Sequence, residues 1–303
     1  MEKTIRIGTR DSQLALWQAT LVQTQLAALG HHSELVHIKS EGDMDLVTPL
    51  YATGVQGVFT RTLDAALLGG RIDLAVHSMK DVPVQLAHGL STAAVLVRAS
   101  PVDLLVLRGD ASFLDDRDGV ATIATSSLRR KAQWLHRYPH HQIDNIRGNV
   151  NTRLAKVASS DWQGAIFAAA GLERIGLRPD TAVALDWMLP APAQGAILVV
   201  RRTGDDAIHD ICAPIHDAVT ATCVQAERAF LSALMGGCST PIGALAEPAP
   251  GGFRFRGNVC ALNGSQCLTV DRLASPDDVL TVARTAGDEL LTRGAGHLIQ
   301  KLS

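Results

Sequence analysis

Two kinds of hydrophobic spacing alternate along the first two thirds of the chain. Short apolar runs at 4–8 and 72–76 are typical of buried strands, whereas apolar residues recur at helical spacing over 12–29 and 61–68. Ser12 is a suitable N-cap for the first of these helices. This alternation predicts a largely parallel sheet that is covered by helices.

The same alternation restarts after Pro101. We expect further strands at 103–107, 120–124, 142–146 and 165–169, and further helices at 127–138 and 150–158. Another apolar strand, at 195–200, follows the prolines of 190–192. Such a strand can return to the first sheet, which would make the first domain discontinuous.

The last third of the chain has a different pattern. Apolar residues over 219–234 indicate one long amphipathic helix. The segments 253–262 and 265–273 flank Asn263-Gly264, a dipeptide typical of tight β-hairpin turns. A final helix is expected over 275–293, because Ser-Pro-Asp-Asp at its start supplies an N-cap, a first-turn proline and acidic residues.

These patterns divide the chain of 303 residues into three expected domains. Domain 1 comprises 1–98 and 196–215, domain 2 comprises 99–195, and domain 3 comprises 216–303. The first two are predicted to be α/β, and the third is predicted to be α+β with an antiparallel sheet.

Charge and composition exclude several functions. The net charge of −2 argues against a general nucleic-acid binder, so any anion site must be built from local arginines. No apolar run reaches the length of a membrane-spanning helix, and the first residues lack the apolar core of a secretory signal. We therefore expect a cytoplasmic protein that contacts neither nucleic acid nor membrane.

The cysteines point to the same compartment. They lie at 212, 223, 238, 260 and 267, an odd number without C-x-x-C spacing. This argues against a disulfide framework and against a zinc site built on cysteines, and it fits a reducing cytoplasm. Adjacent histidines at 31–32 and 140–141 rarely have metal-ligand geometry, so no metal is assigned.

A polar stretch follows the apolar strand at 72–76. His77, Ser78, Lys80 and Asp81 come directly after it. Ligands of open α/β sheets bind beyond the carboxyl ends of strands, so Asp81 can stabilise a cationic intermediate or carry a proton there. A polar loop with a solvated Lys–Asp pair explains the pattern equally well.

Six arginines lie near the starts or ends of predicted elements: Arg10, Arg129, Arg130, Arg147, Arg153 and Arg174. Helix N-termini favour anions, and arginine adds bidentate recognition of carboxylates. For a single arginine an ordinary surface ion pair is the better explanation. The set as a whole favours a ligand that carries several carboxylates.

Cys238 follows Gly236-Gly237 at the predicted end of the long helix. The glycines give the backbone freedom to leave the helix and to present the cysteine for covalent attachment. A small buried cysteine in a turn is the alternative. The weakly periodic segment from Gly42 to Phe59 is either a mobile lid or a surface loop.

Together these features resemble the porphobilinogen deaminase (hydroxymethylbilane synthase) family along nearly the whole chain. The matching segments occur in order and at the family's spacing: 10–19 (RDSQLALWQA), 77–83 (HSMKDVP), 125–130 (TSSLRR), 147–154 (RGNVNTRL), 170–172 (AGL), 192–196 (PAQGA) and 236–238 (GGC). Any one of them is a weak signal, whereas the ordered set is highly specific.

The resemblance implies a particular fold and reaction. The family has two periplasmic-binding-protein-like (type II) α/β domains around a cleft and a third α+β domain that bears a cysteine. Its enzymes join four porphobilinogen molecules head to tail, release ammonia at each step and yield hydroxymethylbilane. They carry a dipyrromethane cofactor bound through a thioether, and the residue that matches the attachment point is Cys238.

The resemblance also assigns roles to other residues. The matching catalytic carboxylate is Asp81, which would hydrogen-bond the pyrrole N–H groups. The implied cofactor contacts are Lys80, Ser127, Arg129, Arg130, Arg147, Arg153 and Gln194, and the implied substrate contacts are Arg10, Ser12, Arg147, Arg153 and Arg174. We expect porphobilinogen as the small-molecule partner and a monomeric enzyme.

The chain departs from the common family pattern in the 42–59 segment. Many members have two lysines there, whereas this chain has Ala52 and the sequence Val55-Gln56-Gly57. Many members also have Arg-Gly-Asp where this chain has Glu41-Gly42-Asp43. The segment therefore carries less positive charge, and no lysine role is transferred to it.

Two other functions compete with this one. A non-enzymatic anion-binding module explains the α/β halves and the arginines, although it needs neither Cys238 nor a third domain. A transferase of the same fold that acts on another polycarboxylate is the second alternative. A covalent adduct on Cys238 distinguishes these possibilities.

Overall fold

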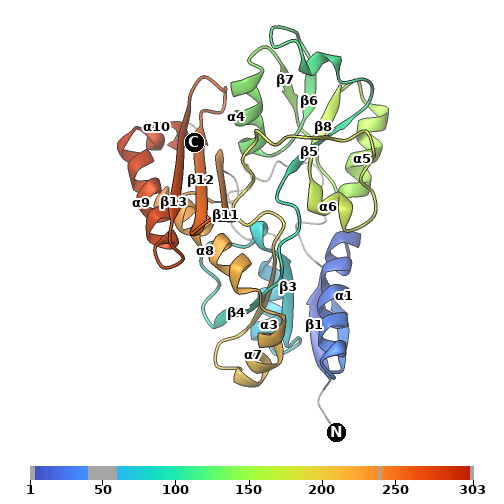
Figure 1. The fold of residues 1–303 in the computed structure, drawn as a ribbon. Coiled ribbons are helices and arrows are strands. Elements are labelled where there is room, and N and C mark those ends of the chain that lie inside the picture. Colours follow the sequence, from blue (N-terminus) through green and yellow to red (C-terminus); the bar gives the residue numbers. More distant parts are fainter. Residues whose placement is uncertain (1–3, 40–59, 238–239, 301–303) are drawn as a thin grey trace. The chain divides into compact units, whose positions relative to one another are not determined.

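A computed structural model describes residues 4–39, 60–237 and 240–300. The chain divides into two compact units. Among the described residues, the first unit consists of 4–39, 60–99 and 195–221, and the second contains the remainder. The first unit is therefore discontinuous, because the chain leaves it near residue 99 and returns near residue 195 (Figure 1).

The first unit is built on a five-stranded sheet of order β2-β1-β3-β10-β4. Its strands are β1 (Ile5–Thr9), β2 (Ser33–His37), β3 (Leu74–Ser78), β4 (Leu90–Val95) and β10 (Ile197–Arg202). Its helical segments are α1 (Gln13–Ala28), α3 (Arg61–Leu68), η2 (Met79–Asp81), α7 (Asp206–Cys212) and η4 (Ala213–Ile215). β1 is parallel to β2 and β3, whereas β10 is antiparallel to both of its neighbours.

The first helix forms where its sequence predicts. Ser12 has extended backbone angles, and its hydroxyl accepts a hydrogen bond from the Ala15 backbone N–H at 3.3 Å, which is an N-cap. Val22 and Leu26 on the helix pack with Ile7 of β1 in one buried cluster. The apolar face of α1 is thus fixed against the sheet, and this places Arg10 in the short connection between β1 and the helix.

The second unit contains another five-stranded sheet, of order β7-β6-β8-β5-β9. Its strands are β5 (Asp103–Leu107), β6 (Thr122–Ala124), β7 (Gln142–Asp144), β8 (Gly164–Ala168) and β9 (Val183–Ala184). The accompanying helical segments are η3 (Ser112–Leu114), α4 (Leu128–Arg137), α5 (Val150–Ser159) and α6 (Ala169–Glu173). β6 is parallel to β7 and β8, and β5 is antiparallel to β8 and β9.

Both five-stranded sheets are therefore mixed, which corrects the prediction of largely parallel sheets. In each sheet the fourth strand, β10 or β5, runs antiparallel to the strands beside it. β10 comes from outside the local strand–helix alternation of the first unit, because the chain passes through the second unit before it. Hydrophobic spacing reports burial but does not report strand direction.

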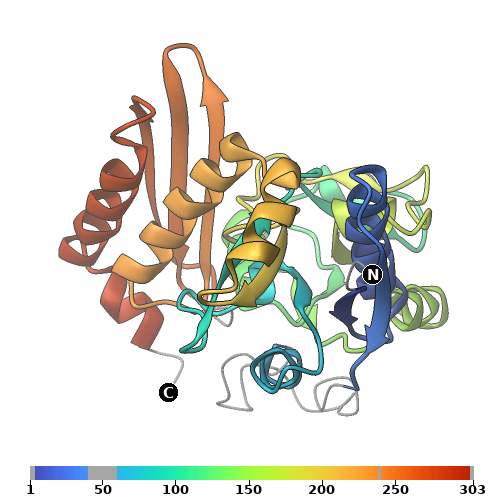
Figure 2. The same cartoon turned by 90° about the horizontal axis from the view of Figure 1, so that it is seen from below.

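The second unit also contains the C-terminal antiparallel sheet, β11-β12-β13. Its strands are β11 (Ile242–Ala249), β12 (Gly252–Cys260) and β13 (Cys267–Ala274). Its helices are α9 (Val279–Thr292), α10 (Ala295–Gln300) and α8 (Ala218–Ala233), of which residues 218–221 belong to the first unit. Phe230 of α8 packs edge-on against Phe255 of β12, with ring centroids 5.3 Å apart. Gly257 admits the Phe230 ring, because a Cβ there would lie 2.6 Å from it. Figure 2 shows α8 and α9 beside this sheet.

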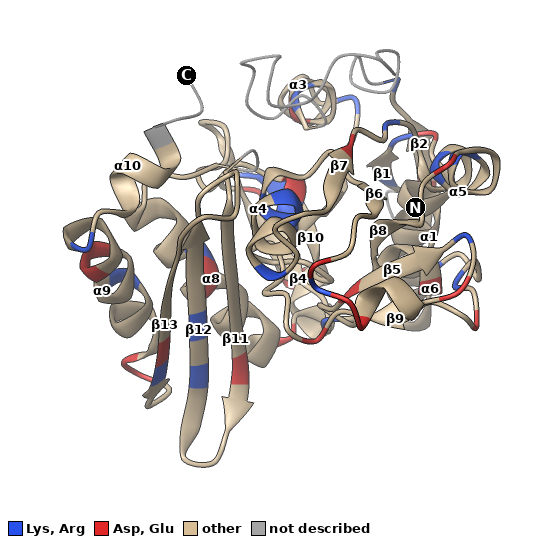
Figure 3. Ribbon diagram, turned by 90° about the horizontal axis from the view of Figure 1, so that it is seen from above, with Lys and Arg blue, Asp and Glu red and all other residues tan. Residues whose placement is uncertain are grey.

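Charged residues lie on the strands of the C-terminal sheet, where Figure 3 shows blue and red bands on β11, β12 and β13. Arg254 of β12 pairs with Asp271 of β13, and Arg256 of β12 pairs with Glu247 of β11 at 2.7 Å. Exposed pairs of this kind contribute little stability, so these residues form a solvated face. No helix in the described part of the chain is long and apolar enough to cross a membrane.

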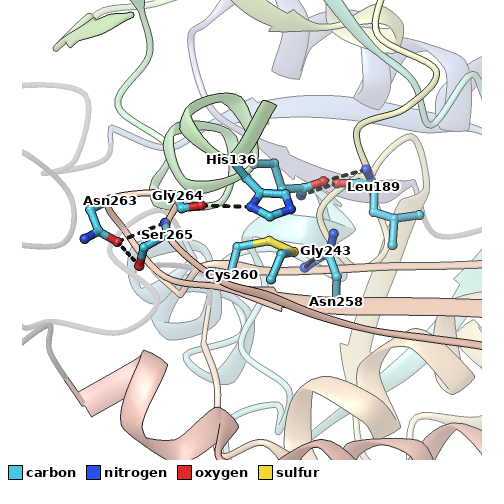
Figure 4. Close-up of a disulfide and its surroundings, with 10 residues drawn as sticks. His136, Leu189, Gly243, Asn258, Cys260, Asn263, Gly264 and Ser265 are labelled. Atoms are coloured by element: carbon cyan, nitrogen blue, oxygen red, sulfur yellow. Dashed lines mark hydrogen bonds between the residues drawn. A yellow bond between two sulfur atoms is a disulfide. The ribbon is translucent and has the colours of Figure 1, made fainter. Parts of the chain in front are cut away.

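A disulfide joins Cys260 and Cys267, which corrects the expectation drawn from the cysteine count (Figure 4). The two residues face each other across the hairpin of β12 and β13. They are equally distant in sequence from the Asn263-Gly264 turn, so the predicted hairpin already implied this pairing. The counting rule missed it because pairing depends on strand register and not on C-x-x-C spacing. Cys212 and Cys223 are buried and take no part in this disulfide.

Candidate functional site

Asp81 lies at the carboxyl end of β3. The strand ends at Ser78, and the single turn η2 carries Lys80 and Asp81 immediately beyond it. Both side chains are partly buried. A sheet edge of this kind is where open α/β folds bind ligands. The structure therefore puts a carboxylate and an ammonium group at the edge that the sequence predicted.

Arg10 lies at the same edge of the sheet. β1 and β3 are parallel, and their register pairs Gly8 with Ala75, so Arg10, directly after β1, lies level with His77 near the end of β3. Ser12 lies two residues further on, as the cap of α1. The first unit thus brings Arg10, His77 and the η2 turn to one edge, because neighbouring parallel strands end together.

His77 has the most perturbed environment at this edge. Its side chain is 6% exposed, and its Nε2 atom is buried without a hydrogen-bond partner. Burial and, in the same direction, the nearby positive charge of Arg10 together lower the pKa of His77 to about 4. His77 is therefore neutral at pH 7. The sequence marked it as part of the polar stretch but gave no sign of this burial.

Gln18 supports the end of β3. Its Nε2 donates a hydrogen bond to the Ser78 hydroxyl at 2.8 Å, and that hydroxyl lies 3.3 Å from the Gln18 Oε1 atom. Gln18 belongs to α1 and is 2% exposed. The helix that follows Arg10 thus also fixes the residue that precedes the Lys80–Asp81 turn.

In the second unit, Arg129, Arg130 and Gln194 gather around Asp103. Arg129 Nη1 lies 2.7 Å from Asp103 Oδ2, and Arg130 Nη2 and Gln194 Nε2 lie 2.8 and 2.9 Å from Oδ1. All four residues are nearly inaccessible to solvent, with exposures from 0 to 6%. The resemblance assigned Arg129, Arg130 and Gln194 as cofactor contacts, but nothing in the sequence indicated Asp103, which has the pattern of the first residue of an apolar strand.

The cluster has an excess of positive charge. Burial alone would raise the pKa of Asp103, but the two guanidinium groups hold it well below its usual range, so the residue is ionised. Burial lowers the pKa of Arg129 despite Asp103. Two guanidinium groups face one carboxylate, and Arg129 Nε is buried without a hydrogen-bond partner among the described residues. The arrangement is therefore suited to a further anionic group.

Arg130 and Arg129 are also tied to the backbone. Arg130 Nη1 donates to the Ile166 carbonyl at 2.8 Å, and Arg129 Nη1 donates to the Leu189 carbonyl at the same distance. Ser127 caps α4, and its hydroxyl accepts from the Arg130 N–H at 3.5 Å. These bonds fix the guanidinium groups, so the cluster is preorganised.

Arg147 and Arg153 lie at the start of α5. Asn149 caps this helix, because its side chain accepts a hydrogen bond from the Thr152 N–H at 2.9 Å. Gly148 has a φ of 114°, and a Cβ there would lie 2.8 Å from the Thr152 side chain. Arg153 Nε donates to the Gly148 carbonyl at 2.8 Å. Arg147 is 7% exposed.

Arg174 lies at the C-terminal end of the short helix α6. Burial lowers its pKa to about 10, although the neighbouring carboxylate of Glu173 acts in the opposite direction. At pH 7 Arg174 is charged and partly desolvated. A cation in this state gains more from an anionic ligand than an exposed arginine does.

The predicted attachment residue, Cys238, lies outside the described residues, but both flanks are described. α8 is followed by Met235 in a left-handed conformation with φ 51°. Gly236 then donates its N–H to the Leu231 carbonyl at 2.9 Å, and Thr240 donates N–H and hydroxyl hydrogen bonds to the Gly237 carbonyl. The residue that leaves the helix is thus Met235, and not a glycine as the sequence suggested.

Gly236 is required for packing instead. A Cβ there would lie 2.5 Å from Ile242 and 2.7 Å from Leu231. The proposed lid from Gly42 to Phe59, with its unusual Ala52 and Val55, lies outside the described residues as well. Its role stays a prediction.

The fold and these residues define an α/β protein with positions suited to an anionic ligand. Comparison with known proteins adds the family. The porphobilinogen deaminase dipyromethane cofactor binding domain matches residues 5–210, and the porphobilinogen deaminase C-terminal domain matches residues 221–292. The porphobilinogen deaminase of Syntrophotalea carbinolica is 43% identical over 302 residues, which cover 98% of this chain and 96% of that protein.

The chain belongs to the porphobilinogen deaminase family. It is a transferase of the hydroxymethylbilane synthase type, and its cofactor is dipyrromethane. The predicted fold class, two α/β domains of the periplasmic-binding-protein type with a C-terminal antiparallel-sheet domain, is confirmed. The cleft and the boundary between domains 2 and 3 stay predictions.

Solved structures of other proteins are less similar to this chain. The probable amino-acid ABC transporter extracellular-binding protein ytmK from Bacillus subtilis is 12% identical, with a TM-score of 0.43 over 71% of this chain and 90% of that one. YhfZ from Shigella flexneri is 16% identical, with a TM-score of 0.37 over 75% of this chain and 94% of that one.

Proposed function

We propose that Asp81 is the catalytic carboxylate of this enzyme. The observation that carries this assignment is its place at the carboxyl end of β3, next to Lys80 and at the edge where Arg10 also ends. Joining pyrroles passes through positively charged species. A fixed carboxylate lowers the energy of that charge and accepts the proton that is lost when the ring regains aromaticity.

The environment of Asp81 leaves it as the acid–base group of this edge. His77 is neutral and its Nε2 atom is enclosed by protein, and Lys80 and Arg10 are cations. The cations supply charge for the acetate and propionate arms of porphobilinogen. Ser12 adds a hydroxyl at the start of α1. The first unit thus provides both the reacting carboxylate and contacts for the substrate arms.

The second unit holds the dipyrromethane. We assign its carboxylates to Arg129, Arg130 and Gln194, with Ser127 as a further hydrogen-bonding group. The fit rests on the excess positive charge around Asp103 and on the buried Arg129 Nε atom. Dipyrromethane, bound to Cys238 through a thioether, would supply the terminal pyrrole carbon to which substrate is joined. Lys80 is assigned as an additional contact.

Arg147, Arg153 and Arg174 complete the set. The first two stand at the N-terminus of α5, where backbone N–H groups and the helix dipole also favour anions. Arg174 is partly desolvated, which strengthens its attraction for a carboxylate. We assign all three to substrate arms, and the first two to cofactor arms as well. The enzyme is proposed to act as a cytoplasmic monomer.

The test is the turnover of Asp81→Ala. The proposal predicts a loss of at least about a hundredfold in kcat with an unchanged unfolding midpoint, because a partly buried carboxylate at a strand end contributes little to packing. Asp210→Asn is the matched control, since Asp210 is an exposed carboxylate on α7 of the same unit. Turnover of Asp81→Ala close to that of Asp210→Asn would remove Asp81 from the chemistry.

A further inference from the structure

The pairing of Cys260 with Cys267 follows from the hydrogen bonds around it. Ala261 donates its N–H to the Gln266 carbonyl at 2.8 Å, whereas the Cys260 N–H turns to the Pro241 carbonyl on the other side of β12. The cysteines therefore form a cross-strand pair without ladder hydrogen bonds between them. Side chains of two strands come closest at such pairs, and here the Cα atoms are 4.0 Å apart.

The two sulfur-bearing residues differ in access. Cys260 is 0% exposed, whereas Cys267 is only partly buried. A disulfide opens when a thiolate attacks one of its sulfur atoms in line with the S–S bond. Cys267 is the more exposed residue of the pair, so we expect an incoming thiolate to attack its sulfur and Cys260 to leave.

We propose that Cys260 and Cys267 form a thiol–disulfide exchange site that controls how the β12–β13 hairpin packs on α4. The reductant is a small dithiol or a dithiol protein. Its first thiolate forms a mixed disulfide with Cys267 and releases the Cys260 thiolate, which takes up a proton. Its second thiolate then displaces Cys267, so the protein gains two electrons and two protons while the dithiol becomes a disulfide.

The hairpin turn is the element through which the bond acts. The carbonyl oxygen of Gly264, in the turn, lies 2.8 Å from His136 Nδ1 on α4 (Figure 4). A Cβ at Gly264 would lie 2.3 Å from the Leu135 carbonyl carbon, so the backbones of turn and helix are in direct contact. The disulfide closes the hairpin three residues from this contact and thus limits the movement of the turn.

The same face of α4 continues to the buried arginine cluster. Arg129, Gln133 and His136 are spaced by four and three residues, which places them on one side of the helix. Gln133 and Arg129 both donate to the Leu189 carbonyl, at 2.9 and 2.8 Å. The disulfide state is therefore linked by continuous contacts to the helix that carries Arg129 and Arg130.

The first experiment is peptide mapping of the full-length chain. Cleavage after Arg256 and Arg272 releases residues 257–272, a peptide that contains Cys260 and Cys267 and no other cysteine. After incubation with oxidised glutathione and thiol blocking, the proposal predicts an unlabelled peptide that is lighter by two hydrogen atoms than the reduced peptide. After treatment with dithiothreitol it predicts a doubly labelled peptide. A doubly labelled peptide under both conditions would overturn it.

Single variants test the direction of attack. Cys260→Ser leaves the accessible sulfur, so Cys267 should take up one glutathionyl group from oxidised glutathione. Cys267→Ser leaves the enclosed sulfur, so Cys260 should react at least about tenfold more slowly, since exchange requires access. Equal rates in the two variants would contradict the assigned order. Both products are detected by the mass of the 257–272 peptide. Modification of Cys238 therefore does not affect the measurement.

Hydrogen exchange tests the consequence for packing. Reduction of the wild-type chain should speed exchange of the backbone amides around Gly264 by about tenfold, because the hairpin loses its cross-link. Amides of α7, which lies in the other unit, serve as the internal reference. Unchanged exchange around Gly264 after complete reduction would show that the bond does not control the hairpin.

Discussion

His77 illustrates how one buried side chain shapes the reactive edge. The imidazole is enclosed, and Arg10 lies beside it, so the neutral form is favoured. A neutral histidine is in keeping with Asp81 as the proposed acid–base group at this edge. A charged His77 would instead add a positive group and compete for the carboxylates that Arg10 is proposed to bind.

The same burial predicts a pH dependence of stability. In the unfolded chain His77 has its ordinary pKa of 6.5, whereas in the folded chain the pKa is about 4. Between these values the unfolded chain binds the additional proton, so the free energy of unfolding falls as the pH is lowered from 6.5 to 4. The loss is roughly 3 kcal/mol at most.

Chemical denaturation at several pH values measures this loss. The control is His77→Gln, which keeps a polar side chain of similar length and does not titrate. The wild type should lose more stability than this variant between pH 6.5 and 4, and above pH 7 their difference should be constant. Parallel profiles throughout would show that His77 is not buried in its neutral form.

Met235 is a second residue whose conformation leads to a prediction. It is 83% exposed and left-handed, a conformation that costs a non-glycine residue about 1 kcal/mol. Met235→Gly should therefore raise the free energy of unfolding by up to about 1 kcal/mol. Met235→Ala keeps a Cβ and should give no such gain. Equal denaturation midpoints for the two variants would rule out the left-handed assignment.

At the scale of elements, the β12–β13 turn contacts helix α4 within the second unit. Gly264 has a φ of 74° and no room for a Cβ beside α4. Gly264→Ala should lower the free energy of unfolding by about 2 kcal/mol, since it combines backbone strain with displacement of the helix. The β11–β12 turn offers the control: Gly251 has a φ of 78° and nothing within 4 Å of its Cβ position.

Thermal or denaturant unfolding of both variants separates the two effects. Gly251→Ala should lose only the strain component, about 1 kcal/mol. The difference between the variants therefore measures the contact between turn and helix. Equal losses in the free energy of unfolding would mean that the hairpin turn does not pack tightly on α4. The disulfide would then have no contact through which to affect the helix.

Elements with a strong local signal were predictable. β5 occupies 103–107 as expected, and α5 begins at Val150 as expected, because an apolar run and a helix cap are properties of neighbouring residues. β11 was missed. It contains alanines, Glu247 and Pro248, which have low strand propensity, and it forms the edge of a sheet where proline is tolerated.

At the scale of the whole molecule, the discontinuous first unit and the family were accessible from sequence, whereas the buried cluster was not. Asp103 stands 26 and 27 residues before its two arginine partners. No local spacing rule connects them, since the contact depends on how β5 and α4 pack. Without Asp103, the arginines read as groups free for a ligand, and the structure shows that one carboxylate already lies between them.

The proposed function requires that this chain holds dipyrromethane through Cys238. The most direct test is the intact mass of the chain purified from a host that makes heme. We expect the mass of the polypeptide plus two pyrrole units, an adduct that is lost in Cys238→Ser and kept in Cys223→Ser. A fully active chain with the unmodified mass would contradict it.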